Sequence, residues 1–276
     1  SMLPPAPAAT IPFTSPNACN ICHTDKDALW SDQWVRRWRN RDYQAPVLRR
    51  AALIDAARKR DWRKLPAIMD YITGKERNEV FAASLIRLIS PSGDSRIGPA
   101  LLKAMEDPSP LVRASAADGL QFVPSAEGAR KLVEATGDAY RLVRVRAASS
   151  LAAYPQLVLN DTEKKRVGEA TGEYRLSITA RPDLWSSHYN LGNYHLNRGD
   201  LKPSVSAFDT ALKLEPQAVL PMVNRALAYA RLGETRKADE SLQLALKTAP
   251  GNPVAHFNMG LLRAEQNNLP SAEKHL

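Results

Sequence analysis

Asp107-Pro108-Ser109-Pro110-Leu111-Val112-Arg113 begins a pattern that returns 31 residues further along the chain. The positions that return are Asp107, Val112, Arg113, Ala116 and Leu120, as Asp138, Val143, Arg144, Ala147 and Leu151. Weaker copies begin near Val80 and Leu48. Within each copy the apolar residues have the spacing of one helix face. The pattern therefore predicts about four helical hairpins between residues 46 and 158.

The second half of the chain has a longer period of 34 residues. Small residues and asparagines recur in one helix of each unit, and apolar residues recur in the next helix. The recurring sets are Gly192, Ala226 and Gly260; Asn190, Asn224 and Asn258; Ser204, Ala238 and Ala272; Phe208, Leu242 and Leu276; and Pro182, Pro216 and Pro250. Small residues at close approaches, with large apolar residues filling the space between helices, predict stacked hairpins.

Both periods resemble known repeats. The 31-residue pattern D-x-x-x-x-V-R-x-x-A-x-x-x-L resembles HEAT repeats, and the 34-residue pattern resembles tetratricopeptide (TPR) units. No segment alternates apolar and polar residues between hairpin turns, as strands would. The expected fold is all-α: an α-α superhelix, or solenoid, of HEAT-like hairpins (46–158) that continues into about two and a half TPR units (159–276).

One predicted helix, over residues 163–180, belongs to both arrays. Ala170 lies 34 residues before Ser204, so this helix takes the place of a TPR second helix. It also follows the last HEAT-like first helix, over residues 142–153. A shared helix predicts a continuous, rigid solenoid that holds the amino-terminal segment at a fixed position relative to the TPR groove.

Cys19-Asn20-Ile21-Cys22-His23 is a C-x-x-C-H motif that contains both cysteines of the chain. The motif is typical of c-type haem attachment, in which Cys19 and Cys22 form thioethers and His23 binds the iron. A Cys19–Cys22 disulfide, a thioredoxin-like redox pair and half of a zinc site are the alternatives. The redox pair would need a βαβ context, and structural zinc prefers four ligands where this region offers at most three.

The stretch from Pro16 to Trp30 resembles the last haem-binding segment of multihaem c-type cytochromes that continue into HEAT and TPR repeats. The resemblance implies one covalent haem c, electron transfer to a protein partner, and a periplasmic or otherwise extracytoplasmic location in a bacterium. Such relatives have further motifs upstream. Here residues 1–18 contain no other C-x-x-C-H motif and no histidine to act as a distal ligand.

The residues after the motif predict a helix with Thr24 as N-cap and Asp27 at its third position. This helix, within the haem segment over residues 17–45, places Trp30, Trp34 and Trp38 on one face. Trp30 is the best candidate for contact with the haem. We expect the stripe as a whole to pack the helix onto the first HEAT-like hairpin, since apolar residues at helical spacing usually form core.

No distal iron ligand can be assigned from the sequence. His188, His195 and His256 occupy positions where TPR units place packing side chains, and His275 lies at the end of the chain. The methionines inside the repeats fit the role of core residues.

The net charge is +9, and the basic residues are concentrated near the cysteine motif. Residues 36–64 contain eleven arginines and lysines against three aspartates. Such a zone can steer an acidic partner, although solvated helix faces explain it equally well. Nucleic acid is a poor partner for an exported haem protein. No apolar run predicts a membrane span, and the proline-rich residues 1–16 predict an extended leader whose export signal has been removed.

Two functions fit these patterns. One is an extracytoplasmic c-type haem protein for electron transfer whose solenoid docks a redox partner, and the other is a non-redox scaffold with a structural C-x-x-C-H segment. Either would bind a protein or peptide through the first helices of the TPR units, at Tyr189, Asn190, Asn193, Asn224, Arg231, Asn258 and Glu265. The chain shows no catalytic motif. A multihaem enzyme would require further haem motifs beyond this chain.

Overall fold

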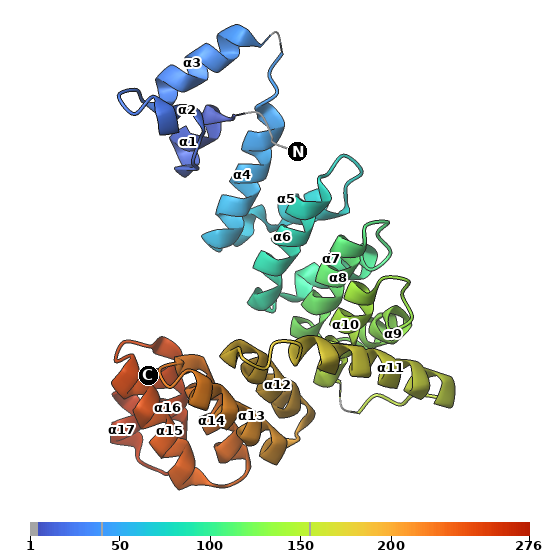
Figure 1. The fold of residues 1–276 in the computed structure, drawn as a ribbon, viewed down its shortest axis with the longest axis vertical. Coiled ribbons are helices and arrows are strands. Elements are labelled where there is room, and N and C mark those ends of the chain that lie inside the picture. Colours follow the sequence, from blue (N-terminus) through green and yellow to red (C-terminus); the bar gives the residue numbers. More distant parts are fainter. Residues whose placement is uncertain (1–4, 40, 155) are drawn as a thin grey trace. The chain divides into compact units, whose positions relative to one another are not determined.

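The computed structural model describes residues 5–39, 41–154 and 156–276, and within these ranges all regular structure is helical, without strands (Figure 1). The prediction of an all-α helical-repeat fold is confirmed. Contacts divide the chain into two compact units, Ser1–Gly128 and Ala129–Leu276. No helix in the described ranges is both long enough and apolar enough to cross a bilayer.

The first unit contains α1 (Pro7–Phe13), α2 (Cys19–Cys22), α3 (Ala28–Trp38), α4 (Ala45–Arg58), α5 (Leu65–Thr73), α6 (Glu79–Ile89), α7 (Gly98–Ala104) and α8 (Pro110–Gly119). The short 3-10 turns η1 (Trp62–Lys64), η2 (Ser90–Ser92), η3 (Ser95–Ile97) and η4 (Leu120–Phe122) lie between or after these helices. Helix α9 (Ala126–Ala135) begins in the first unit and ends in the second.

The second unit continues with α10 (Arg141–Ser150), η5 (Leu151–Ala153), α11 (Asp161–Ile178), α12 (Trp185–Arg198), α13 (Leu201–Leu214), α14 (Val219–Arg231), α15 (Thr235–Thr248), α16 (Pro253–Glu265) and α17 (Leu269–Glu273). Successive hairpins pack side by side from α12 to α17 (Figure 1).

The prediction of an extended leader is wrong for residues 7–13, which form α1. Pro7 stands at the start of this helix, where its fixed φ suits the first turn and its missing N–H leaves no donor unpaired. Ala8 and Ala9 are small enough to bury their face of α1 against α3 and α4. Local burial of small residues therefore outweighs the bias of a proline-rich composition.

The 31-residue pattern has a clear structural basis in the turn before each motif helix. The carboxylates of Asp107 and Asp138 each accept a hydrogen bond from the backbone N–H two residues further on, at 2.9 and 2.8 Å. Arg113 and Arg144 donate back to the carbonyls of these aspartates, at 2.6 and 2.9 Å. The aspartate and the arginine thus fix one turn, and the apolar positions between them, such as Val112, are fully buried.

The 34-residue pattern matches residue sizes between paired helices. A Cβ atom on Gly192 would lie 2.5 Å from the ring of Phe208, which is fully buried. In the next unit the corresponding pair is Ala226 and Leu242. Leucine is smaller than phenylalanine, so it leaves room for the methyl group of Ala226. The glycine is required by the close approach of α12 and α13.

Helix α11 packs against the helices on both of its sides in the second unit. Ala170 and Tyr174 on α11 share a buried cluster with Val145 and Ala148 on α10 and with Tyr194 on α12. The rings of Tyr174 and Tyr194 lie 5.2 Å apart. This helix therefore takes the place that the sequence predicts for residues 163–180.

Candidate functional site

The cysteine motif forms the short helix α2, which is held by two asparagines. The Oδ1 atom of Asn17 accepts hydrogen bonds from the backbone N–H groups of Cys19 and Asn20, at 3.1 and 3.2 Å. The side chain of Asn20 donates to the Lys26 carbonyl at 2.7 Å and accepts from the Ser31 hydroxyl at 3.1 Å. These contacts join α2 to the loop after it and to α3. Sequence reasoning missed both asparagines, although Asn is a common side-chain cap before a helical turn.

The two thiols of the motif are unpaired and open to solvent. Cys19 is half-buried and Cys22 is exposed, one helical turn apart. The ring of His23 is exposed and accepts or donates no hydrogen bond to the described residues. The described residues also contain no group of three or more His, Cys, Asp or Glu side chains that would hold a metal ion. The two thiols are therefore not joined to each other, and the His23 ring has no hydrogen-bond partner among the described residues.

A row of aromatic rings leads away from His23, in which Trp30 and Trp34 are half-buried and Trp38 is exposed. The ring of His23 lies 4.9 Å from Trp30, Trp30 lies 6.2 Å from Trp34, and Trp34 lies 5.9 Å from Trp38. The buried residues of α3 are instead Ser31 and Val35, and Trp38 is 67% exposed. The expectation that the whole tryptophan stripe packs onto the first hairpin is therefore wrong, because α3 turns a different face inward.

The start of α3 also differs from its prediction. The N-cap is Asp27, whose Oδ1 accepts from the backbone N–H of Trp30 at 2.7 Å, and the helix begins at Ala28. Thr24 lies in the preceding loop and is exposed. A carboxylate at this position satisfies the first turn and complements the helix dipole, so the aspartate outcompetes the threonine.

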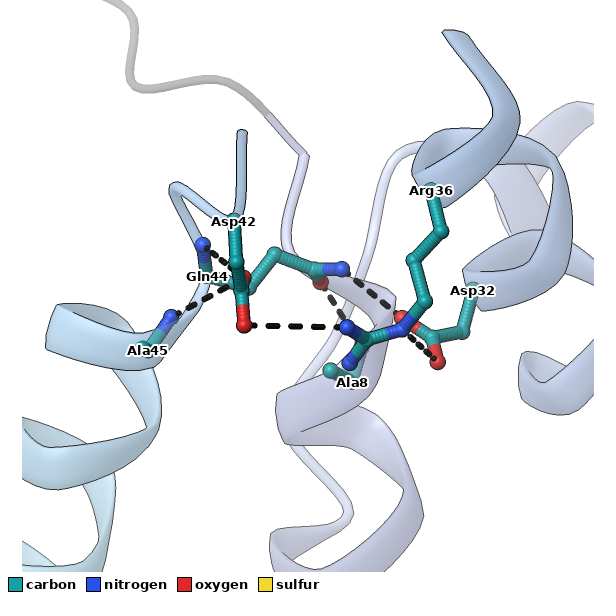
Figure 2. Close-up of polar contacts among 6 residues, drawn as sticks. All are labelled: Ala8, Asp32, Arg36, Asp42, Gln44 and Ala45. Atoms are coloured by element: carbon teal, nitrogen blue, oxygen red, sulfur yellow. Dashed lines mark hydrogen bonds and ion pairs between the residues drawn. The ribbon is translucent and has the colours of Figure 1, made fainter. Parts of the chain in front are cut away.

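A polar network around the buried side chain of Gln44 ties this amino-terminal part to α4 (Figure 2). The amide of Gln44, which is 1% exposed, accepts from the backbone N–H of Ala8 at 3.0 Å and donates to Asp32 at 2.7 Å. Asp32 also accepts from Arg36 at 2.8 Å, and this hydrogen bond raises the pKa of Arg36 above its usual value. The cysteine segment is thereby anchored within the first unit.

Two histidines outside the motif make the same contact in different repeat units. His188 and His256, two 34-residue periods apart, contact the carbonyls of Pro182 and Pro250 through Nε2, at 3.0 and 2.7 Å. His195 lies beside the carboxylate of Asp200. The equivalent contacts of His188 and His256 indicate packing roles, as the sequence predicts.

Three of the predicted partner-binding residues come together across α12 and α14. The Nδ2 atom of Asn224 donates to Tyr189 Oη at 3.2 Å and to Asn193 Oδ1 at 2.7 Å. Arg231 is exposed and donates to the Leu196 carbonyl at 3.3 Å.

The other predicted partner-binding residues stand apart from this cluster. Asn258 bonds within its own helix, to the Val254 carbonyl at 2.8 Å. Asn190 and Glu265 are exposed and have no polar partner among the described residues. The structure thus joins α12 and α14 through a polar patch and leaves the remaining candidates separate.

Family models match HEAT repeats over residues 75–152 and tetratricopeptide repeats over residues 189–253 and 223–276. The chain carries both kinds of repeat. The matched segments begin at residue 75, so the cysteine motif lies outside them. Because HEAT and TPR arrays are typical protein-binding surfaces, the repeats indicate an interaction scaffold.

A curated relative is the "Tetratricopeptide repeat and J domain-containing co-chaperone DNJ1" of Fusarium oxysporum, which is 33% identical over 79 residues. The match covers 29% of this chain and 15% of the relative, so the chain spans a small part of that protein's length.

Similar solved structures include MamA, at 16% identity and a TM-score of 0.38, covering 59% of this chain and 86% of that one. MamA 41-end from Desulfovibrio magneticus RS-1 is 18% identical with a TM-score of 0.38, over 66% of this chain and 90% of that one. The APC/C hetero-tetramer Cut9-Hcn1 is 16% identical with a TM-score of 0.36, over 90% and 55% respectively. Likeness at this level does not bear on function.

Proposed function

We propose that this protein is a helical-repeat scaffold that binds a protein partner on the first helices of its TPR units. The observation that carries the proposal is the polar patch formed by Tyr189, Asn193 and Asn224. Asn224 uses its amide N–H groups inside the patch, and its Oδ1 atom accepts no hydrogen bond from the described residues. The free amide oxygen of Asn224 and the exposed guanidinium of Arg231, seven residues further along α14, offer an acceptor and donors to a peptide backbone.

The test is quantitative capture of a partner identified by crosslinking in the source organism. We expect the combined change Asn224→Ala and Arg231→Ala to weaken capture by about tenfold or more, as loss of an interface hot spot does. Arg236→Ala is the matched control, because Arg236 is an exposed arginine on the second helix α15, where it pairs with Glu240. If the double variant and Arg236→Ala captured equal amounts of the partner, the proposal would be refuted.

We also propose that a haem c is bonded to Cys19 and Cys22, with His23 on the iron. Three observations support this: unpaired thiols one helical turn apart, an imidazole ring without a hydrogen-bond partner among the described residues, and an adjacent row of half-buried and exposed indoles. The bound haem would supply a one-electron couple. The protein residues would attach it, orient it and shield it from water, with Trp30 nearest the imidazole.

Electron transfer and an extracytoplasmic location are part of this second proposal. Thioether attachment occurs outside the cytoplasm, and the basic residues 36–64 would orient an acidic redox partner toward the haem. The same scaffold would then hold that partner on its repeats.

The decisive measurement for the haem is the intact mass of protein produced together with a haem-maturation system. We expect the chain to gain the mass of one haem, and the change Cys19→Ser with Cys22→Ser to abolish the gain completely. Trp30→Ala is the control, because it should keep the covalent haem and shift only its absorption or potential. A mass showing bare thiols or a Cys19–Cys22 disulfide would refute haem attachment and leave the scaffold proposal intact.

A further inference from the structure

A hollow of about 510 Å³ lies in the first unit where the ends of α4 and α6 meet. Its lining includes three arginines, Arg58, Arg60 and Arg87, and three apolar side chains, Trp62, Leu88 and Pro91. The hollow is separate from the cysteine motif and from the TPR patch, and its lining contains no carboxylate.

The three guanidinium groups have no ion pair or hydrogen bond with any residue that the structure describes. The nearby carboxylates are already engaged, since Asp55 pairs with Lys59 at 2.8 Å and Asp61 pairs with Arg63 at 2.7 Å. All three arginines are exposed, so solvent and salt screen their mutual repulsion only in part, and an anionic group between them would lower it further.

Two of these arginines have a local role as well. Arg58 and Arg87 lie in the last turns of α4 and α6, where a positive charge offsets the negative end of the helix dipole. This role does not explain Arg60, which lies beyond the end of α4.

Arg60 adopts a left-handed conformation with a φ of 56°. Its turn closes α4 through hydrogen bonds from Arg60 N–H to the Ala57 carbonyl and from Asp61 N–H to the Ala56 carbonyl. Glycine is the usual residue at such a position, and this chain uses it at Gly93, Gly199 and Gly233. An arginine here costs more backbone energy than glycine would, which makes the position a candidate for a side chain with a function. Thr14 and Asn267 are the other non-glycine residues with a positive φ in the described ranges.

We propose that this hollow binds an acidic peptide segment of a protein partner. Carboxylates of the segment would pair with Arg58, Arg60 and Arg87, since a guanidinium matches a carboxylate with two parallel hydrogen bonds. An apolar side chain of the segment would pack on Trp62 and Leu88. The apolar wall and the volume favour a peptide over a small inorganic anion, which would leave most of the hollow unfilled.

The test is fluorescence anisotropy of the full chain with a labelled peptide composed of Glu, Asp and Leu. The control peptide has the same sequence with Gln and Asn in place of Glu and Asp. A single-stranded oligonucleotide of equal charge serves as the competitor. We expect the acidic peptide to bind much more tightly than the neutral peptide. Its affinity should fall as the salt concentration rises. Equal affinity for the two peptides, or tighter binding of the oligonucleotide, would overturn the proposal.

Arg60→Gly is the sharpest variant, because it removes the guanidinium and relieves the strained turn together. We expect binding of the acidic peptide to fall about tenfold while the melting temperature stays equal to or above that of the parent. Arg87→Gln should weaken binding similarly, and Arg63→Gln is the matched control, since Arg63 neighbours Trp62 but pairs with Asp61. Unchanged affinity in Arg60→Gly and Arg87→Gln would show that the peptide binds elsewhere, and an equal loss in the control would show that net charge alone is responsible; either result overturns the proposal.

Discussion

Replacing Asp107 by alanine is expected to lower the free energy of unfolding of the first unit by about 3–5 kcal/mol. Asp107 forms an ion pair with Arg77, and each of these side chains is only 10% exposed. The same carboxylate accepts from the backbone N–H of Ser109 at 2.9 Å. Alanine would leave a buried guanidinium and a backbone donor unpaired. Hydrogen exchange in α6 and α8 measures the loss within this unit, apart from unfolding of the second unit.

Two further variants separate the contributions of Asp107. Asp107→Asn keeps an oxygen for the Ser109 N–H but removes the charge. Its free energy of unfolding should therefore fall by less than that of Asp107→Ala. Adding Arg77→Met to Asp107→Asn should recover part of the loss, because no unpaired buried charge remains. A loss below about 1 kcal/mol for Asp107→Ala would mean that water compensates Arg77, since exposed pairs have effects of that size.

The sequence predicts the repeats well because each period is set by local contacts. Asp107 and Arg113 fix a turn between residues six apart, and the same positions recur one period later as Asp138 and Arg144. The Arg77 partner of Asp107 could not be found in this way. Arg77 lies in the loop before α6, outside the recurring motif, and only the packed hairpins bring it to the aspartate.

The amino-terminal segment was harder to predict because its elements are short and owe their order to tertiary contacts. Helix α1 depends on burial against α3 and α4, and Gln44 supplies the partner for the Ala8 N–H from 36 residues away. The tryptophan stripe has helical spacing, which normally indicates core, yet the inward face of α3 carries Ser31 and Val35. Spacing predicts that residues share a face, but it does not predict which face is covered.

The same limit applies to the sites. Repeat positions identify which residues lie on the first TPR helices, but the bonds of Asn224 to Tyr189 and Asn193 depend on how α12 and α14 pack. The left-handed turn at Arg60 has no sequence signature, because glycine is the residue that would mark it. The C-x-x-C-H motif is the opposite case, since its chemistry lies in contiguous residues and its helical turn is local.

Phe208→Ala is expected to lower the stability of the second unit by about 3–5 kcal/mol. The ring is fully buried, packs with Leu196 and Ala228, and lies 6.0 Å from the ring of Tyr189. Because Gly192 has no side chain to move into the space, the cavity cannot close from α12. Urea unfolding followed by circular dichroism measures the change, with α13 exchange protection identifying the unit.

A size-matched pair tests whether this contact follows the rule of the repeat. Gly192→Ala alone places a methyl group 2.5 Å from the Phe208 ring, and overpacking of this kind lowers stability by about 1–3 kcal/mol. Phe208→Leu alone leaves a gap above the glycine. Together the two changes recreate the pair Ala226 and Leu242 of the next unit, so the double variant should lose clearly less than the sum of the single losses. Additive losses would show that α12 and α13 are held by other contacts, and that the sizes in these positions vary independently.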